Sequence, residues 1–130
     1  MADAVAAAGV VLCEGSADPY HPKTVRAAAG SLTHLPVVPG IATLELVAAA
    51  QRRGIVVALD GSGTIDIDDV PIDRPVTLLA GAEARGLPAD VMGACDVVAC
   101  LPIWGRNESL NLGAAVAVAA YSLTRRIRTT

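Results

Sequence analysis

LPIWGRNESLNLGAAVAVAAYSL, the stretch Leu101–Leu123, decides how the rest of this chain is organised. It begins as the apolar end of a strand, passes through a polar turn at 105–108 and continues as a helix. Ser109 is the expected N-cap, because its hydroxyl can accept a hydrogen bond from a free amide of the first turn. The helix is apolar nearly all round, which predicts that it lies inside the protein. Asn111 is the exception, and a buried amide needs a hydrogen-bond partner.

The composition fits a single globular domain whose core is built from small aliphatic side chains. The chain has 130 residues, of which 53% are hydrophobic and only 2% aromatic, with no Phe. Such hydrophobicity excludes a disordered chain, and the length predicts one domain. The net charge of -3 excludes a general attraction for nucleic acid. An RNA partner would be held by a local patch, by a dimer surface, or by a part of the protein outside this sequence.

Apolar runs and cysteines together predict a cytoplasmic protein that does not enter a membrane. The longest uncharged apolar run, near 110–123, is shorter than the roughly 20 residues that span a bilayer. The start MADAVAAAGVVLC has an acid and no Lys or Arg before its apolar run, which argues against a signal peptide. Cys13, Cys95 and Cys100 are an odd number without paired spacing, so we expect buried reduced thiols and not a disulfide or zinc site.

Short apolar runs alternate with runs of helical spacing along the chain. The strands are expected at 10–13, 35–38, 55–59, 76–80 and 96–101, with a brief edge strand at 65–67. The helices are expected at 2–8, 23–29, 41–53, 88–94 and from 109 onward. This alternation predicts an α/β fold with a mostly parallel sheet flanked by helices. The run at 55–59 is apolar throughout, so we expect both of its faces to be covered.

The segment DGSGTIDIDDVPIDRP, 60–75, leaves a nucleotide loop and a metal site to consider. Asp60, Gly61 and Gly63 resemble part of a dinucleotide-binding loop, but no third glycine and no helix follow, so that fingerprint fails. The closely spaced acids could bind a metal. A solvated loop is the better interpretation, and we expect no metal.

Unusual sequence follows three of the expected strands and predicts a ligand site there. In open α/β sheets, ligands lie beyond the carboxyl ends of the strands. Glycine at such an end lets a ligand approach bare backbone, and backbone groups can read the edge of an adenine. Apolar side chains of the last segment could sandwich the ring. The residues concerned are Asp60, Gly81, Leu101, Ile103 and Leu110.

Three segments in register resemble the SpoU (TrmH-like) branch of the SPOUT RNA methyltransferases. LPIWGRNESLNLGAAVAVAAY resembles the last signature of that family, LLAGAEARGLPADVMGACDVVACLP the signature before it, and GSADPYHPKTVRAAAGSLTHLPV its early segment. The likeness covers nearly the whole chain. It implies a deep C-terminal trefoil knot, a homodimer, and S-adenosylmethionine bound in the knot. It also implies methyl transfer to a ribose 2′-hydroxyl of ribosomal or transfer RNA.

The resemblance assigns roles to individual residues. Asp60, Gly81, Leu101 and Leu110 fall on cofactor-contact positions, while Glu83, Ser109 and Asn111 fall on the polar positions that are the expected catalytic set. Because the sulfonium is already a good leaving group, the protein has to position the hydroxyl and accept its proton. Glu83 and Asn111 can orient groups, and neither is an obvious base.

The family's first signature, which carries an Asn and the proposed catalytic Arg, would come immediately before a segment like 2–5. We therefore expect the chain to be the C-terminal part of a methyltransferase, with Arg26 and Arg106 as the candidate substitutes for that Arg. A cofactor-binding or dimerisation module without catalysis is the first alternative. Binding of S-adenosylmethionine without RNA methylation would favour it. A Rossmann-like dinucleotide-binding protein is the second, and the missing glycine fingerprint argues against it.

Overall fold

The structure, a computed structural model, describes residues 1–16 and 34–130. The contacts within the chain divide it into two units, Met1–Leu46 and Val47–Thr130. The helix expected at 23–29, together with Arg26, falls outside the described residues.

The first unit contains a parallel pair of strands, β1 (Val10–Cys13) and β2 (Val37–Ile41). The pairing places Val10 opposite Val37 and Cys13 opposite Ile41. β1 has the expected bounds, whereas β2 begins after Pro36 and runs three residues beyond the expected end. Its apolar character continues past Pro39, and Gly40 adopts a positive φ of 76° that only glycine takes easily.

The segment 2–8 is a run of turns and not the expected helix. Its amides donate irregularly, Val5 to the carbonyl of Met1 and Ala6 to that of Asp3, and Ala6 has a φ of 55°. An alanine-rich stretch this short lacks the length that an isolated helix needs. His34 is a loop residue as expected, with its Nδ1 3.5 Å from the Asp3 carboxylate.

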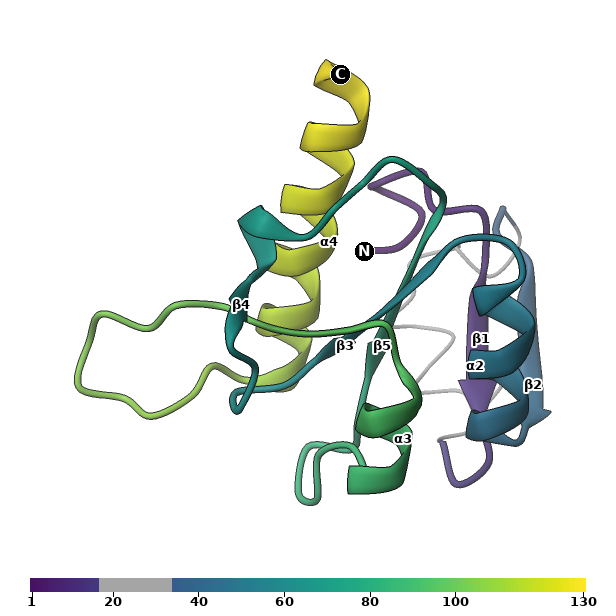
Figure 1. Cartoon of the computed structure of the whole chain (residues 1–130), viewed down its shortest axis with the longest axis horizontal. Helices are drawn as coiled ribbons and strands as arrows, with labels where there is room; N and C mark the ends of the chain where they lie inside the picture. The colour runs from purple at the N-terminus through teal and green to yellow at the C-terminus, as the bar shows by residue number, and fades with distance from the viewer. Residues whose placement is uncertain (17–33) are drawn as a thin grey trace. The chain divides into compact units, whose positions relative to one another are not determined.

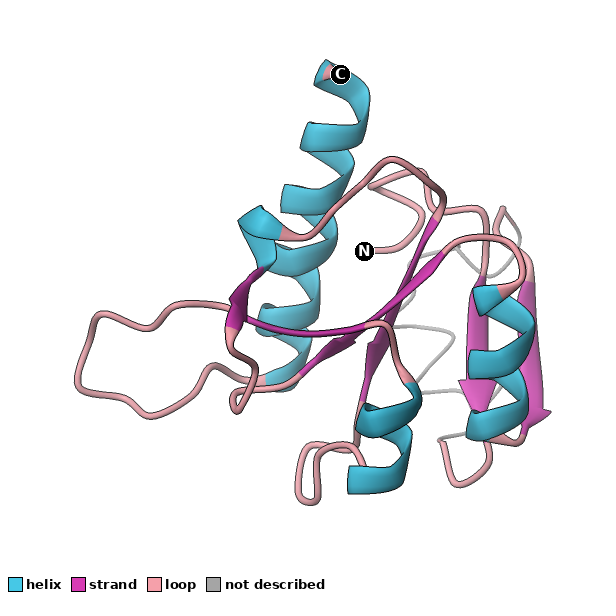
Figure 2. Cartoon of the chain, in the orientation of Figure 1, coloured by secondary structure: helices cyan, strands magenta, loops and turns pink. Residues whose placement is uncertain are grey.

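The second unit is built on a four-stranded parallel sheet (Figure 2). Its strands are β3 (Ile55–Leu59), β4 (Ile65–Asp66), β5 (Val76–Ala80) and β6 (Val97–Cys100), in the order β4-β6-β3-β5. All three neighbouring pairs are parallel. The expected α/β class is therefore confirmed, and β4 is the edge strand that the alternating sequence predicted.

Every residue of β3 is apolar and buried, which shows that both faces of the sheet are covered at this strand. Ile55, Val57 and Leu59 point to one face, where they pack with α4 (Leu112–Thr129). Val56 and Ala58 point to the other face, where they pack with α3 (Ala89–Ala94) and with the end of α2 (Thr43–Gln51). Figure 1 shows α4 and α3 on opposite sides of β3.

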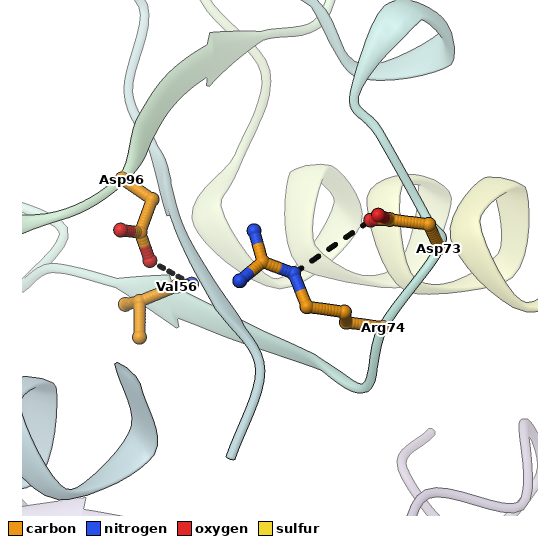
Figure 3. A network of polar contacts seen from close by, with 4 residues as sticks. All are labelled: Val56, Asp73, Arg74 and Asp96. Atoms are coloured by element: carbon orange, nitrogen blue, oxygen red, sulfur yellow. Dashed lines mark hydrogen bonds and ion pairs between the residues drawn. The ribbon is translucent and has the colours of Figure 1, made fainter. Parts of the chain in front are cut away.

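A polar contact fixes the amino end of β3. The Asp96 carboxylate accepts a hydrogen bond of 2.7 Å from the amide of Val56 and one of 3.2 Å from Gln51 Nε2. Figure 3 shows the first of these beside an exposed ion pair in which Arg74 Nε lies 3.7 Å from Asp73. The exposed pair adds little stability. The Asp96 contact instead satisfies a backbone donor of a buried strand, which would be costly to leave unpaired.

Arg126 binds α4 to the short 3-10 helix η2 (Ile67–Asp69), which follows β4. Its guanidinium donates to the carbonyl of Ile67 at 3.0 Å and to that of Val70 at 2.6 Å. One turn earlier, the Ser122 hydroxyl donates to the Asp68 carboxylate. These contacts hold the helix on the sheet at the end opposite to its N-cap.

The expectation that the last helix lies wholly inside the protein is wrong for the described chain. Ala119 and Leu123 are buried, but Val118 and Tyr121 are 50% and 59% exposed. A single sheet can cover only one side of a helix, so the apolar residues on the other side remain at the surface.

Replacing Arg126 with Ala should lower the free energy of unfolding by about 2 kcal/mol. The variant leaves two backbone carbonyls of the Ile67–Val70 segment without their charged donor. Arg128→Ala is the matched control, because Arg128 is an exposed arginine in the same last turn. Its unfolding free energy should stay within about 0.5 kcal/mol of the parent value. Urea unfolding followed by circular dichroism measures both, and equal losses would contradict the role given to Arg126.

Candidate functional site

The segments that follow β3, β5 and β6 leave the sheet at one edge, because these three strands are parallel neighbours. Asp60 follows β3, Gly81 follows β5 and Leu101 follows β6, each directly after the last residue of its strand. The sheet thus brings together the three strand ends at which the sequence predicted a ligand site.

Two of the expected polar residues meet across this edge. Asn111 Nδ2 donates a hydrogen bond of 3.0 Å to Glu83 Oε1. Asn111 Oδ1 also accepts from the amide of Ala114 at 3.2 Å, so the same side chain caps α4. The residues are 28 apart in sequence and come from different strand-end segments. The amide therefore joins the loop after β5 to the start of the last helix.

Asn111, and not Ser109, is the N-cap of α4. Asn caps helices as well as Ser does, and its side chain takes the usual acceptor role toward the third residue of the helix. Ser109 lies in the exposed segment before the helix, and its hydroxyl makes no hydrogen bond within the described residues. Its predicted catalytic role stays a prediction.

Asp60 is held in a turn by its own neighbour. The amide and the hydroxyl of Ser62 both donate to Asp60 Oδ1, at 2.9 and 2.7 Å. The Ser62 hydroxyl and then its amide lower the pKa of the Asp60 carboxyl below its ordinary value, which outweighs the effect of partial burial. Asp60 therefore presents a fixed anion at this edge of the sheet at neutral pH.

Gly81 has no room for a side chain, because backbone of the same loop occupies that space. A Cβ at this position would come within 2.2 to 2.4 Å of the backbone of Gly86 and Leu87. The loop folds back on itself there, with the Gly86 amide donating to the carbonyl of Ala82 at 2.7 Å. The glycine is needed to close this loop. Whether a ligand also touches it stays a prediction.

Gly63 is a second close approach, which the sequence reasoning treated only as part of a failed fingerprint. A Cβ there would lie 2.6 to 2.9 Å from the backbone of Ala99 and Cys100. The loop after β3 therefore passes directly against the end of β6. The signal in the sequence was the pair Gly61 and Gly63 in the loop that directly follows a buried strand.

The apolar members of the predicted cofactor set lie on the segment between β6 and α4. Leu101 is half-buried, whereas Ile103 and Leu110 are 38% and 44% exposed. Leu101 and Leu110 line an open groove of about 670 Å³, and Ile103 does not. Trp104 lines the same groove and is a residue that the sequence reasoning passed over. Figure 1 shows this segment extending away from the sheet before it returns to α4.

Neither a metal cluster nor a disulfide is present in the part of the chain that the structure describes. No three His, Cys, Asp or Glu side chains converge within residues 1–16 and 34–130. Cys13, Cys95 and Cys100 are free and half-buried. Burial, followed by the neighbouring Asp96, raises the pKa of the Cys95 thiol, so this thiol is protonated at neutral pH. No described helix is long and apolar enough to cross a membrane.

In a comparison with known protein families, one family matches nearly the whole chain. The model of the SpoU rRNA Methylase family matches residues 1–121. The chain belongs to this family. Among its SpoU-type relatives is a 23S rRNA uridine 2′-O-methyltransferase of Streptomyces viridochromogenes, which is 34% identical over 96% of this chain and 46% of its own length. A 23S rRNA guanosine 2′-O-methyltransferase of Bacillus subtilis is 33% identical over 94% of this chain and 49% of its own.

Solved SpoU structures share the same fold. The SpoU methyltransferase AviRb of Streptomyces viridochromogenes, in complex with AdoMet, gives a TM-score of 0.89 at 31% identity, over 99% of this chain and 53% of that one. An AdoMet-bound rRNA methyltransferase of Sinorhizobium meliloti gives 0.87 at 32% identity, over 97% and 49%. The chain thus spans about half the length of each of these four proteins.

Replacing Asn111 with Ala should destabilise the start of α4 by about 1 kcal/mol, because the variant removes the cap. Asn111→Asp keeps an acceptor for the Ala114 amide but sets a carboxylate against Glu83 in place of a donor. It should therefore keep most of the helix content and lose the link between the two loops. Circular dichroism and the hydrogen-exchange rate of the Ala114 amide separate the two effects.

Asn107→Ala is the control for these variants, because Asn107 lies exposed in the same segment. Its stability should match that of the parent chain. If Asn111→Ala also unfolded like the parent, Asn111 would not be the cap that the structure shows.

Proposed function

We propose that this chain is the catalytic domain of an S-adenosylmethionine-dependent RNA methyltransferase that acts on a ribose 2′-hydroxyl. The observation that carries the proposal is the hydrogen bond between Asn111 and Glu83. It brings the polar residues of two family signatures to one edge of the sheet. The names of the relatives support ribosomal or transfer RNA as the substrate class, since they include 2′-O-methyltransferases of both.

The chemical groups at this edge of the sheet suit S-adenosylmethionine as a ligand. Backbone of the tight 81–87 loop would offer a surface for a flat adenine, and the carboxylates of Asp60 and Glu83 would favour a cationic ligand. When bound, the cofactor would supply a methyl group on a positively charged sulfur, which is a good leaving group.

The residues of the chain would then orient the ribose hydroxyl, which would give up its proton to solvent water as the methyl group arrives. Glu83 is an exposed carboxylate whose position is fixed by Asn111 Nδ2. In this role it accepts a hydrogen bond from the ribose and aligns the oxygen for attack, while Asn111 keeps the carboxylate in place. Holding the reacting groups in one geometry is a large part of what such an enzyme must supply.

We also propose the deep trefoil knot of the family for the segment that ends in α4. Two contacts support it. Asn111 ties the chain after β6 to the loop after β5, and Arg126 ties α4 to the segment after β4. The returning chain is thus attached to two earlier loops from opposite ends of one helix. The free, half-buried cysteines suit the cytoplasm, which is the location we propose.

A homodimer is the assembly that the small-residue face of α4 supports. Small residues recur on the side of the helix turned away from both the sheet and the groove, which allows another helix to approach closely. They are Gly113, Ala117, Ala120 and Thr124, with Ile127 at the end. A second copy of the chain could pack its own α4 there, as a two-fold dimer interface requires.

Methyl transfer and cofactor binding test the proposed function together. The parent chain should bind S-adenosylmethionine in calorimetric titration and transfer a tritiated methyl group to ribosomal or transfer RNA lacking 2′-O-methylation. Glu83→Gln should reduce transfer by roughly a hundredfold, because the carboxylate that aligns the hydroxyl is lost. Cofactor affinity should change much less.

Glu108→Gln is the matched control, since Glu108 is another exposed acid of the same edge segments. It should transfer methyl groups at the parent rate. A parent chain that binds the cofactor but methylates none of these RNAs would favour the alternative of a non-catalytic binding or dimerisation module. A parent chain that binds no cofactor would contradict the proposal outright.

The proposed dimer predicts a mass in light scattering of about twice the 13.2 kDa of one chain. Ala117→Glu should give monomers, because it would place two carboxylates in the contact between the helices. Glu45→Ala, on the exposed side of α2, is the control and should leave the dimer intact. A monomeric parent chain at micromolar concentration would rule the dimer out.

A further inference from the structure

Trp104 is the most exposed large apolar side chain of the described residues, with 92% of its surface open to solvent. Aromatic residues are rare in this chain, which has one Trp, two Tyr and no Phe. The hydrophobic clusters of the described residues contain no aromatic side chain at all. Two of the three aromatics, Trp104 and Tyr121, instead line one groove. Among the described residues, aromatic rings therefore lie at the surface and not in the core.

The groove runs between the segment before α4, the helix itself and η2. Trp104 and Leu110 line it from the segment, while Val118, Tyr121 and Arg125 line it from α4. Its volume of about 670 Å³ is large enough for a nucleotide. The segment that carries Trp104 also carries Asn111, so the groove and the polar pair share one stretch of chain.

The charged groups of the groove are mostly satisfied within the protein. Asp66 accepts from the amide of Asp68, and Asp68 accepts from the Ser122 hydroxyl. Arg126 donates to two backbone carbonyls. Arg125 is the exception, since its guanidinium makes no hydrogen bond or ion pair with any described residue. A cation available to a ligand thus lies in the same groove as two aromatic rings.

We propose that this groove holds an unpaired nucleotide of the substrate RNA, with its base stacked on Trp104 and its phosphate near Arg125. The inference rests on the proposed function and specifies how the RNA is held. Proteins that bind single-stranded RNA combine aromatic faces for the bases with cations for the backbone. A base within a duplex is already stacked on its neighbours and cannot stack on Trp104. The nucleotide held in the groove is therefore expected in a loop, a bulge or another unpaired region of the RNA.

A second copy of the chain fits this groove less well. Roughly half of the side chains that line it are polar or charged, whereas the centre of a homodimer interface is predominantly apolar. The small-residue face of α4 that suits a helix partner lies on another side of the helix. The two surfaces can therefore be tested independently.

The single Trp makes the proposal directly measurable, because fluorescence excited at a wavelength that the two tyrosines do not absorb reports on Trp104 alone. An unstructured RNA such as oligo(U) should quench this fluorescence, and a duplex RNA at equal phosphate concentration should quench it less. In anisotropy titrations with labelled RNA, Trp104→Ala should weaken binding of oligo(U) about ten- to a hundredfold. Trp104→Phe keeps an aromatic face and should retain most of the affinity. Leu44→Ala, which removes an exposed apolar residue outside the groove, should retain all of it.

Arg125→Gln tests the second contact. It should lower the slope of log affinity against log salt concentration by about one, because one phosphate contact is lost. Arg128→Gln should change the slope less, since Arg128 does not line the groove.

The outcomes separate this inference from the proposed function. A parent chain that methylates RNA while Trp104→Ala binds that RNA with parent affinity would overturn the inference and leave the function standing. A parent chain that binds neither S-adenosylmethionine nor RNA would overturn both. A fluorescence shift that follows protein concentration without RNA, together with monomers in Trp104→Ala, would show that the groove holds a second copy of the chain.

Discussion

The second unit depends on the burial of β3 on both faces. Five consecutive apolar residues in an extended strand cannot leave either side of the sheet in water, so each side requires a cover. α4 covers one face, and α3 with the end of α2 covers the other. This requirement makes the chain after β6 return to the sheet as a helix. The return brings Asn111 to the loop that follows β5.

The candidate site uses one side chain for two tasks that are usually separate. Asn111 satisfies a free amide at the start of α4 and also fixes the position of Glu83. Stability and site geometry are thereby coupled at one residue. Asp60, in contrast, is oriented by Ser62 within its own turn, so its position does not depend on the last helix. The site therefore has one part fixed locally and one part fixed by the return of the chain.

Local pattern predicted the elements of the sheet well, since β1, β3 and β5 have the expected bounds. A strand buried on both faces leaves a clear signature in sequence, as 55–59 does. The candidate site was predicted largely through the family signatures. The structure brings Glu83 and Asn111 together, and the roles of these residues stay predictions. The contacts of Gly63 and Arg126 could not be predicted, because each joins positions whose separation in space depends on the finished fold. Ser109 and Asn111 both suit the N-cap, and sequence pattern does not fix a helix start within two residues, so the pattern predicted the wrong residue.

The hydrogen bonds from Arg126 to the carbonyls of Ile67 and Val70 also affect the order in which the chain folds. These partners are 56 to 59 residues apart, so the contact closes a long loop and forms only after both of its ends have been made. Until the ribosome has made and released the chain as far as Arg126, the face of the sheet under α4 has no cover. A nascent chain therefore exposes Ile55, Val57 and Leu59 until the helix has been made. Chaperones that bind apolar strands would meet this segment before the helix does.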